Sequence, residues 1–425
     1  MSQMRALLFP ICLLTALGYA ALPVAAQVQL PGVGLPDLRP TTGQVLETLN
    51  ETAERLDERT ARAARDLLRE RNRAISRYLS QNSRRVEPDQ SGNPARRGEL
   101  LLLDLDAAGS AKLVASGFLM LGQEQIAGLG FAVTRLGVPD GLDLAAAEKL
   151  VSRLVPQASV APDNIHFQSG DLAAPALTGG PQASSAGAPS LAAPTRIPIG
   201  MIDGAPASRL GDFTMRGFAD GAPTPSHHGS AIASLLMKQG VQRIFVADVY
   251  GTDKAGGNAL AIARGLGWLV ESGSKVVTIS LVGPRNAIVE RAIAAAQRKG
   301  TIVVAAVGND GPAAPPAYPA SYDGVVAITA VDGRKRALIE AGHATHLDYA
   351  APGADLTAHN ARGKRVRVRG TSFATPLAAA RIAVALKANS RWRSALDAEA
   401  EDLGEPGPDA TFGRGLVCGT CGGNR

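Results

Sequence analysis

Short apolar runs alternate with longer runs of helical period along the second half of the chain, between Arg196 and Val417. The strand-like runs are "IPIGMI", "RIFVADVY", "KVVTIS", "TIVVAAV" and "GVVAITAV". Helical runs lie between them, for example over residues 259–270 and 287–299. Continuous apolar strands that are separated by helices are typical of a parallel sheet buried on both faces. The alternation therefore predicts an α/β fold with a doubly wound, mostly parallel sheet and helices on both of its faces.

A smaller α/β pattern precedes this region, from about residue 98 to residue 168. "ELLLLDLD" and "GFAVTRLGVP" are typical of strands, and "NIHFQ" is typical of a short last strand. "SAKLVASGFLMLG" and "DLAAAEKLVSRLV" are typical of helices, so this order predicts a small sheet that two helices cover. Residues 169–195 are rich in alanine, proline, glycine and serine and carry almost no charge, which predicts an exposed linker.

The first 26 residues have the pattern of a signal peptide. Arg5 gives a short basic start, residues 6–22 are mostly apolar, and the small residues 24–26 predict cleavage before Gln27. Prolines within and after the apolar run count against an uncleaved membrane anchor, and no later stretch is apolar for long enough to span a bilayer. We therefore expect an exported protein, periplasmic or secreted, with no stable membrane insertion after the signal is removed.

Residues 27–97 form a helical region that is rich in arginine, and residues 41–81 predict one long helix. Thr41 and Gln44 have the spacing of a capping box, and apolar residues recur after them near helical period. One amphipathic helix that packs on a neighbour is the simpler interpretation, and a coiled coil that binds a partner is the alternative. The net charge of the chain is +6, and we interpret the crowded arginines as a solvated helix face rather than a site for an anionic partner. Aromatic residues make up 4% of the chain, which counts against a surface that stacks on nucleic acid.

Two of the three cysteines, Cys418 and Cys421, lie in the C-terminal tail, residues 418–425, and the third lies in the signal segment. Two cysteines do not complete a four-ligand zinc site. In an oxidising compartment they predict a local disulfide.

Four polar residues follow predicted strands or begin predicted helices: Asp203, His228, Asn309 and Ser372. A serine hydroxyl needs a base to take its proton, and an imidazole that a carboxylate orients suits that role. A tetrahedral intermediate also needs a donor to its oxyanion, which an asparagine amide supplies. Active sites of such sheets form beyond the carboxyl ends of the strands, so we expect these four side chains to meet there.

The stretch "GTSFATPLAAA" places Ser372 at the N-terminus of a predicted helix. The backbone N–H of a residue at that position has no partner within the helix, and the helix dipole favours negative charge there. Pro376 is expected in the first turn, where an N–H is not needed.

Seven motifs resemble, in order, those of the subtilisin-like serine peptidases: "MIDGAP", "HHGSAIASLL", "VVTISLVGP", "VVAAVGNDGP", "YPASY", "APGA" and "GTSFATPLAAA". The resemblance covers about residues 196–417 and implies a subtilisin-like fold. It implies that Ser372 is the nucleophile, His228 the general base and acid, and Asp203 its orienting carboxylate. Asn309 would donate to the oxyanion together with the Ser372 backbone N–H.

The resemblance also implies where substrate binds. Residues 280–283, namely Ser280, Leu281, Val282 and Gly283, resemble the edge segment that pairs with the substrate backbone. Tyr318 and Pro319 resemble a tyrosine–proline pair near the substrate pocket that often has a cis bond. Protein or peptide substrates are implied, without a cofactor for the chemistry. Structural calcium is common in the family, but no aspartate-rich loop of this sequence can be assigned to it.

Family members are commonly exported as zymogens, so the resemblance implies that residues 98–168 are a prodomain. Its last strand, "NIHFQ", would then lie in the cleft as a product-like tail, with self-cleavage near Gln168 or within the linker. The whole chain would be a small α/β prodomain and a long helix that precede a catalytic domain at residues 196–417.

The sequence departs from the family pattern at a few positions. Gly204 and Ala205 follow Asp203 where threonine or serine and then glycine are usual, and Ser230 replaces a commoner threonine. Val282 replaces a usual glycine and is expected to narrow the primary pocket. None of these changes removes a catalytic group.

Two other functions remain to be compared with a peptidase. A catalytically silent subtilisin-like fold could act as a binding or chaperone module, and the complete set of four site residues counts against it. An esterase of another fold would place its serine in a nucleophile elbow, but residues 370–374 lack the second glycine of that motif.

Overall fold

The computed structural model describes residues 42–169, 195–388 and 391–421. Contacts divide the chain into two units, residues 1–55 and residues 56–425. The expected signal peptide, most of the expected linker and the end of the tail lie outside the described residues. In the part of the chain that the structure describes, no helix is long and apolar enough to cross a membrane.

A seven-stranded sheet is the largest element of the second unit, and every neighbouring pair of its strands is parallel. The strand order is β14-β13-β12-β10-β7-β9-β8. This confirms the predicted doubly wound parallel sheet, because β9 and β8 lie on one side of β7, and β10, β12, β13 and β14 lie on the other. The strands are β7 (Ile199–Asp203), β8 (Thr214–Gly217), β9 (Ile244–Asp248), β10 (Val276–Ile279), β12 (Ile302–Ala306), β13 (Val326–Val331) and β14 (Tyr349–Pro352).

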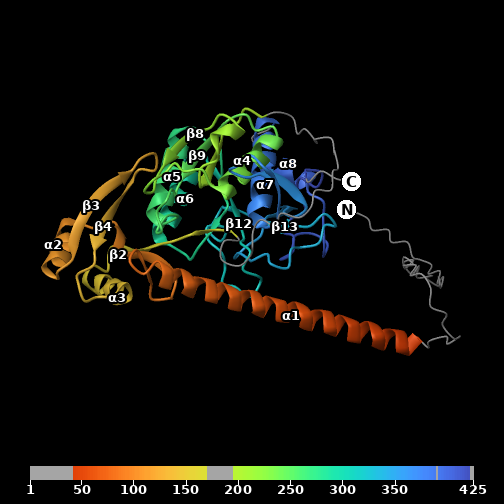
Figure 1. Ribbon diagram of the computed structural model, residues 1–425, viewed down its shortest axis with the longest axis horizontal. Helices are drawn as coiled ribbons and strands as arrows, with labels where there is room; N and C mark the ends of the chain where they lie inside the picture. Colours follow the sequence, from red (N-terminus) through yellow and green to blue (C-terminus); the bar gives the residue numbers. More distant parts are fainter. Residues whose placement is uncertain (1–41, 170–194, 389–390, 422–425) are drawn as a thin grey trace, which may run out of the picture. The chain divides into compact units, whose positions relative to one another are not determined.

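Helices cover both faces of this sheet, as Figure 1 shows. Helices α4 (His227–Lys238) and α7 (Thr371–Ala388) pack on one face, and α5 (Ala259–Glu271) and α6 (Ala287–Arg298) pack on the other. Side chains alternate between the two resulting cores along each strand: in β7, Met201 joins the core of α4 and α7, and Ile202 joins the core of α5 and α6. Continuous apolar strands are therefore required, which is the pattern that the sequence shows.

A second, antiparallel sheet precedes the large one, in the order β1-β2-β4-β3 with β5 on β2. Leu100 and Leu102 of β2 pack against the helices α2 and α3, whereas Leu101 and Leu103 join the core that contains α5 and α6. The run of four leucines is explained by a strand that is buried on both faces. The elements are β1 (Val86–Pro88), β2 (Pro94–Leu103), α2 (Ala107–Ala115), β3 (Leu119–Ile126), β4 (Phe131–Gly137), α3 (Leu144–Leu154) and β5 (Ser159–Asn164).

Two expectations for this region were wrong. The predicted helix "SAKLVASGFLMLG" ends at Ala115, and its second part belongs to β3. Gly117, with φ of +89°, reverses the chain after the helix, and Leu119 then pairs with Gly137 of β4. The predicted strand "NIHFQ" is divided, because β5 ends at Asn164 and a separate β6 (Phe167–Gln168) pairs with β11 (Leu281–Val282).

One long helix, α1 (Thr42–Gln81), occupies the arginine-rich region. Its last turns belong to the second unit and pack within it: the Tyr78 ring meets the Phe167 ring edge-on at 4.9 Å, and Arg71 Nε donates to Asp310 Oδ2 at 3.1 Å.

Several further elements were not predicted, because each of them is short. They are β8, β14, the hairpin of β15 (Leu356–His359) and β16 (Arg365–Val368), and α8 (Trp392–Glu399). Near the end of the described chain, Cys418 and Cys421 form a disulfide.

Candidate active site

The candidate residues lie where strands end and helices begin. Asp203 is the last residue of β7, and Asn309 follows β12 by one short loop. His228 and Ser372 are the second residues of α4 and α7, which pack on the same face of the sheet. Four segments that are distant in the sequence therefore converge at the carboxyl edge of the sheet.

Asp203 and His228 form a close pair. His228 Nδ1 lies 3.0 Å from Oδ1 and 2.8 Å from Oδ2 of the Asp203 carboxylate, which is fully buried. The Gly204 N–H also donates to Oδ1, at 2.7 Å. Ser226 caps α4 by accepting from the Gly229 N–H at 2.9 Å, which fixes the turn that carries the imidazole. A carboxylate in this position can orient the ring and stabilise its protonated form.

Asn309 contacts Thr371, the residue before Ser372. The Asn309 side-chain oxygen accepts from the Thr371 N–H at 2.9 Å and from the Thr371 hydroxyl at 3.1 Å. These bonds fix the orientation of the amide, with its oxygen toward Thr371 and its NH₂ group as the donor for a ligand. The ring of Phe373, the residue after Ser372, lies 5.5 Å from the ring of His228, so the first turn of α7 packs against the imidazole.

Gly370 leaves room for this arrangement. Its φ is +137°, and a Cβ atom at this position would lie 2.7 Å from Asn309 Nδ2. Any side chain would push against the amide, so glycine is required immediately before Thr371.

Pro376 has a role that differs from the one expected. Helix α7 begins at Thr371, so Pro376 lies beyond the first turn, and an N–H at 376 would have bonded the Ser372 carbonyl. The Ser280 hydroxyl donates to that carbonyl instead, at 2.9 Å. The proline thus frees the carbonyl of Ser372 to hold the segment that follows β10.

That segment, residues 280–283, pairs with the chain's own residues 167–169. In antiparallel register Leu281 faces Gln168 and Val282 faces Phe167, and the Ser169 N–H donates to the Ser280 carbonyl at 3.1 Å. The Ser372 hydroxyl donates to the Ser169 carbonyl at 2.6 Å. A peptide backbone therefore already lies along this edge, with one carbonyl at the candidate nucleophile.

On its other side the edge segment pairs with Tyr318. Gly283 N–H donates to the Tyr318 carbonyl at 2.9 Å, the Tyr318 N–H returns a bond at 3.2 Å, and the Tyr318–Pro319 peptide bond is cis.

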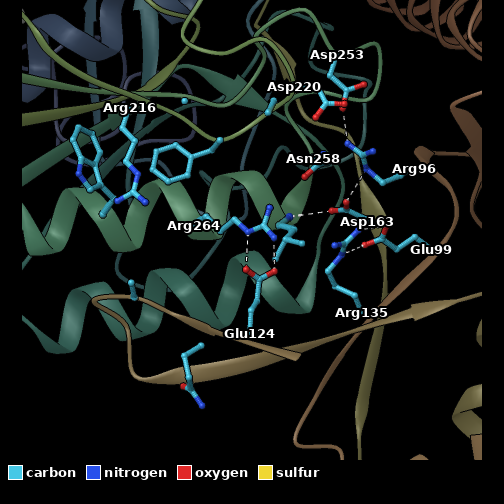
Figure 2. A pocket seen from close by; sticks show the side chains of 17 residues that line it. Arg96, Glu99, Glu124, Arg135, Asp163, Arg216, Asp220, Asp253, Asn258 and Arg264 are labelled. Carbon is cyan, nitrogen blue, oxygen red and sulfur yellow. Dashed lines mark hydrogen bonds and ion pairs between the residues drawn. The ribbon is translucent and has the colours of Figure 1, made fainter. Parts of the chain in front are cut away.

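A polar cavity of about 560 Å³ lies away from these residues, between the small sheet and helix α5. Figure 2 shows Arg96, Arg135 and Arg264 turned toward carboxylates, whereas Arg216 lies over the Phe218 ring. Arg264 pairs with Glu124 through bonds of 2.9 and 2.5 Å, and Arg135 pairs with Glu99 through bonds of 2.6 and 2.9 Å. The cavity is therefore lined by ion pairs, and the pair of Arg264 and Glu124 joins helix α5 to the small sheet.

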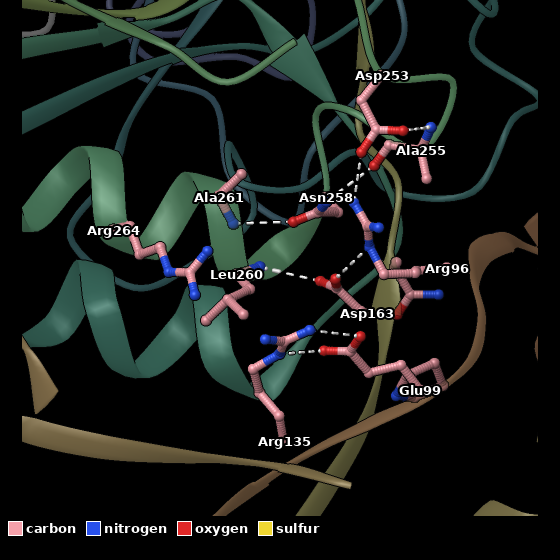
Figure 3. Close-up of polar contacts among 12 residues, drawn as sticks. Arg96, Glu99, Arg135, Asp163, Asp253, Ala255, Asn258, Leu260, Ala261 and Arg264 are labelled. Atoms are coloured by element: carbon pink, nitrogen blue, oxygen red, sulfur yellow. Dashed lines mark hydrogen bonds and ion pairs between the residues drawn. The ribbon is translucent and has the colours of Figure 1, made fainter. Parts of the chain in front are cut away.

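Asp163 lies at the centre of this contact, as Figure 3 shows. One of its oxygens accepts from the Leu260 N–H at the start of α5, at 3.0 Å, and the other lies 3.5 Å from Arg96 Nε. Burial raises the pKa of the Asp163 carboxyl to about 7. Arg96 does not reverse this shift, because it makes its shorter bond, 2.6 Å, to Asp253.

Sequence reasoning missed two contacts of the site. It did not identify the Ser280 hydroxyl as a partner of the Ser372 carbonyl, although Pro376 carried that signal. It also gave no role to the Gln168 side chain, whose Nε2 donates to Asp203 Oδ1 at 2.9 Å, and no pattern in the sequence pointed to that bond. Among the residues that the structure describes, no cluster of three or more His, Cys, Asp or Glu side chains could hold a metal ion.

Comparison with known proteins gives a consistent family. The model of the subtilase family matches residues 214–415, a range that begins after Asp203. Subtilisin BL of Lederbergia lenta is 31% identical over 210 residues, which are 47% of this chain and 76% of that protein. The minor extracellular protease Epr of Bacillus subtilis (strain 168) is 28% identical over 197 residues, which are 45% of this chain and 30% of Epr.

The fold has a counterpart among solved structures. Fervidolysin of Fervidobacterium pennivorans, described as a keratinolytic enzyme related to subtilisin, superposes with a TM-score of 0.60 at 17% identity. The superposition covers 77% of this chain and 61% of fervidolysin.

Proposed function

Since this chain belongs to the subtilase family of serine-type endopeptidases, we propose that it hydrolyses peptide bonds of protein substrates through Ser372, His228 and Asp203. We include in the proposal that it is exported as a zymogen and that it cuts its own chain after Ser169. The observation that carries the proposal is the bond from the Ser372 hydroxyl to the Ser169 carbonyl, on a backbone held in register by the Ser280 carbonyl.

The chemistry follows from this geometry. Ser372 Oγ attacks the carbonyl carbon of Ser169 as His228 takes the hydroxyl proton, and the imidazolium that forms faces the Asp203 carboxylate. The carbonyl oxygen becomes an oxyanion, to which the Asn309 NH₂ group and the Ser372 N–H at the start of α7 are suited donors. His228 then gives the proton to the nitrogen of residue 170 as the peptide bond breaks. Water, deprotonated by the same imidazole, hydrolyses the acyl-enzyme and regenerates Ser372.

The small sheet suits the role of a prodomain. After β5 the chain continues as residues 165–169, the tail of the small sheet, which include β6. Residues 167–169 of this tail lie on the edge segment. The tail blocks the same edge that a substrate would use, since both need the backbone of residues 280–282. In this proposal residues 98–168 are the prodomain, residues 169–195 the linker that is cut, and residues 196–417 the catalytic domain. The proposed reaction uses only groups of the protein and includes no metal ion.

Export rests on the N-terminal signal pattern. The proposal places the mature enzyme outside the cytoplasm, in the periplasm or the medium, and the first 26 residues would be absent from it. N-terminal sequencing of the precursor with Ser372→Ala, recovered from the exported fraction, should find Gln27 first.

Intact mass with and without a fluorophosphonate probe tests the catalytic proposal. The wild-type chain should shorten to a fragment that begins at residue 170 or within the linker, and Ser372 should take the probe. Ser372→Ala should stay long and unlabelled. Ser274→Ala, which removes another buried serine hydroxyl, is the control and should behave as the wild type does. If the wild type neither shortens nor reacts, the binding or chaperone module becomes the function to pursue.

Asn309 provides a second test of the same proposal. Asn309→Asp keeps the oxygen that Thr371 uses but removes the amide donor, so it separates folding from oxyanion stabilisation. We expect kcat to fall by about 10²–10³-fold, the loss that removing such a donor causes in subtilisin, with little change in KM. An unchanged kcat would remove Asn309 from the proposed mechanism.

A further inference from the structure

The tail of the small sheet makes one contact with the catalytic residues that backbone pairing does not require. Gln168 Nε2 donates to Asp203 Oδ1 at 2.9 Å, one residue before the carbonyl that Ser372 contacts. The same oxygen accepts from the Gly204 N–H at 2.7 Å and faces His228 Nδ1 at 3.0 Å. Asp203 is fully buried, so every group that reaches its carboxylate has to be a donor.

The backbone next to Asp203 leaves this oxygen within reach. Gly204 has no side chain, and a Cβ atom built on it would press on Ser226 Oγ at 2.5 Å and lie in ordinary contact with Gln168 Nε2 at 3.5 Å. The Gln168 amide therefore lies beside residue 204 as well as beside the Asp203 carboxylate.

We infer that Asp203 is also a specificity-determining group, which selects substrates with a carboxamide side chain, glutamine above all, at the position before the residue whose carbonyl is attacked. This inference rests on the proposed function and names the substrate class of the same site. In it, Gln168 is the chain's own example of the preferred side chain.

The chemistry of the carboxylate explains why an amide is selected. An apolar side chain of equal size would leave the Asp203 oxygen without its third donor, which costs a hydrogen bond to a charged group. A glutamate would bring a second carboxylate to the same oxygen, and like charges at that distance repel strongly. A lysine would donate, but its charge would offset that of Asp203 and weaken the support that His228 needs when it becomes protonated.

Short peptides that copy the tail, Asn-Ile-His-Phe-Gln-Ser-Gly with a fluorophore and a quencher at the ends, test the inference on the processed enzyme. We expect kcat/KM to fall about 10- to 100-fold when the glutamine becomes leucine. The glutamate peptide should be poorer than the leucine peptide. It should gain on the glutamine peptide as the pH falls through the range in which a glutamate takes up a proton.

The chain's own processing gives a second readout. Gln168→Glu and Gln168→Leu should both slow the shortening of the precursor, and the glutamate variant should slow it more. Gln157→Glu adds the same charge at an exposed turn and should process at the wild-type rate.

The outcomes separate this inference from the proposed function. If Ser372 takes the fluorophosphonate probe but the three peptides are cleaved equally well, the selection by Asp203 is wrong and the peptidase stands. If the wild type takes no probe and cleaves no peptide, the proposed function fails and this inference fails with it.

Discussion

The large sheet is covered on both faces by helices of its own part of the chain, whereas the small sheet has its own helices on one face only. In β2, Leu100 faces α2 and α3, and Leu101 faces the core of α5 and α6. The second face of the small sheet is therefore covered by α5 and α6, the helices that also cover the large sheet. A β-sheet that leaves one apolar face to a neighbour has little stability of its own, so the two parts are expected to differ in independence.

The first prediction tests whether the two faces of the small sheet differ, with substitutions at adjacent residues of β2. Leu101→Ala and Leu100→Ala, made in the Ser372→Ala chain, should each lower the free energy of unfolding by about 2–5 kcal/mol, because both side chains are fully buried. They should differ in where the structure loosens. By hydrogen exchange, Leu101→Ala should reduce protection in the small sheet and in α5 and α6, and Leu100→Ala in the small sheet, α2 and α3. Identical exchange patterns would show that the two faces are not distinct.

The second prediction concerns Asp163, the buried carboxyl at the contact. Its pKa of about 7 in the packed structure exceeds the ordinary aspartate pKa of 3.8 that it regains in the unfolded chain. Between these values the folded form keeps a proton that the unfolded form has lost, so stability falls as the pH rises from about 4 to about 7 and then levels off. The groups that face it are Arg96, Glu99 and Arg264, together with the Leu260 N–H.

Asp163→Asn should remove this pH dependence. In the Ser372→Ala chain, the urea midpoint of the parent should drop between pH 4.5 and pH 7.5 by more than that of the asparagine variant, with a difference of at most about 4 kcal/mol in unfolding free energy. Asp104→Asn, which removes an exposed carboxylate of the same sheet unit, controls for the lost charge. Parallel pH curves for the parent and Asp163→Asn would contradict the shifted pKa.

The third prediction is the smallest and concerns α1. Arg71 pairs with Asp310, and both side chains are less than a fifth exposed, at 19% and 17%. Arg71→Ala should therefore cost about 1–3 kcal/mol of unfolding free energy, since Asp310 is left buried without its donor. Arg77, on the same helix, pairs with Glu70 where both side chains are far more exposed, and Arg77→Ala should cost much less than Arg71→Ala. Equal losses in thermal unfolding would mean that α1 contributes nothing specific through Arg71.

Much of the fold could be predicted because the central strands of a parallel sheet have to be apolar along their whole length. The edge strand β8 (Thr214–Gly217) faces water on alternate positions and carries one large apolar residue, so it gave no such signal. The segment "FLMLG" was assigned to a helix because short apolar runs fit both periods. Leu119 is an apolar residue that is 63% exposed on the edge strand β3, so this strand also lacks the alternation of apolar and polar residues that indicates a half-buried strand.

The site was predictable to the extent that its residues lie at strand ends and helix starts. The motifs predict Asp203, His228, Asn309 and Ser372 as site residues; in the structure Asp203 pairs with His228, and Asn309 and His228 contact Thr371 and Phe373, the two neighbours of Ser372 in the sequence. The bond between Gln168 and Asp203 could not be anticipated, because it joins a tail to a strand of a different sheet. Its existence depends on the register of β6 on β11, which no local pattern encodes.

The shared face of the small sheet has a consequence for the order of events in time. In the proposed cleavage after Ser169, departure of the small sheet would expose Leu101, Leu103 and Val133 to water. A small sheet that has lost the packing on one face unfolds readily, and peptidases cleave unfolded chains more readily than folded ones. Activation would then be irreversible, because each small sheet that dissociates is degraded and cannot bind the enzyme again.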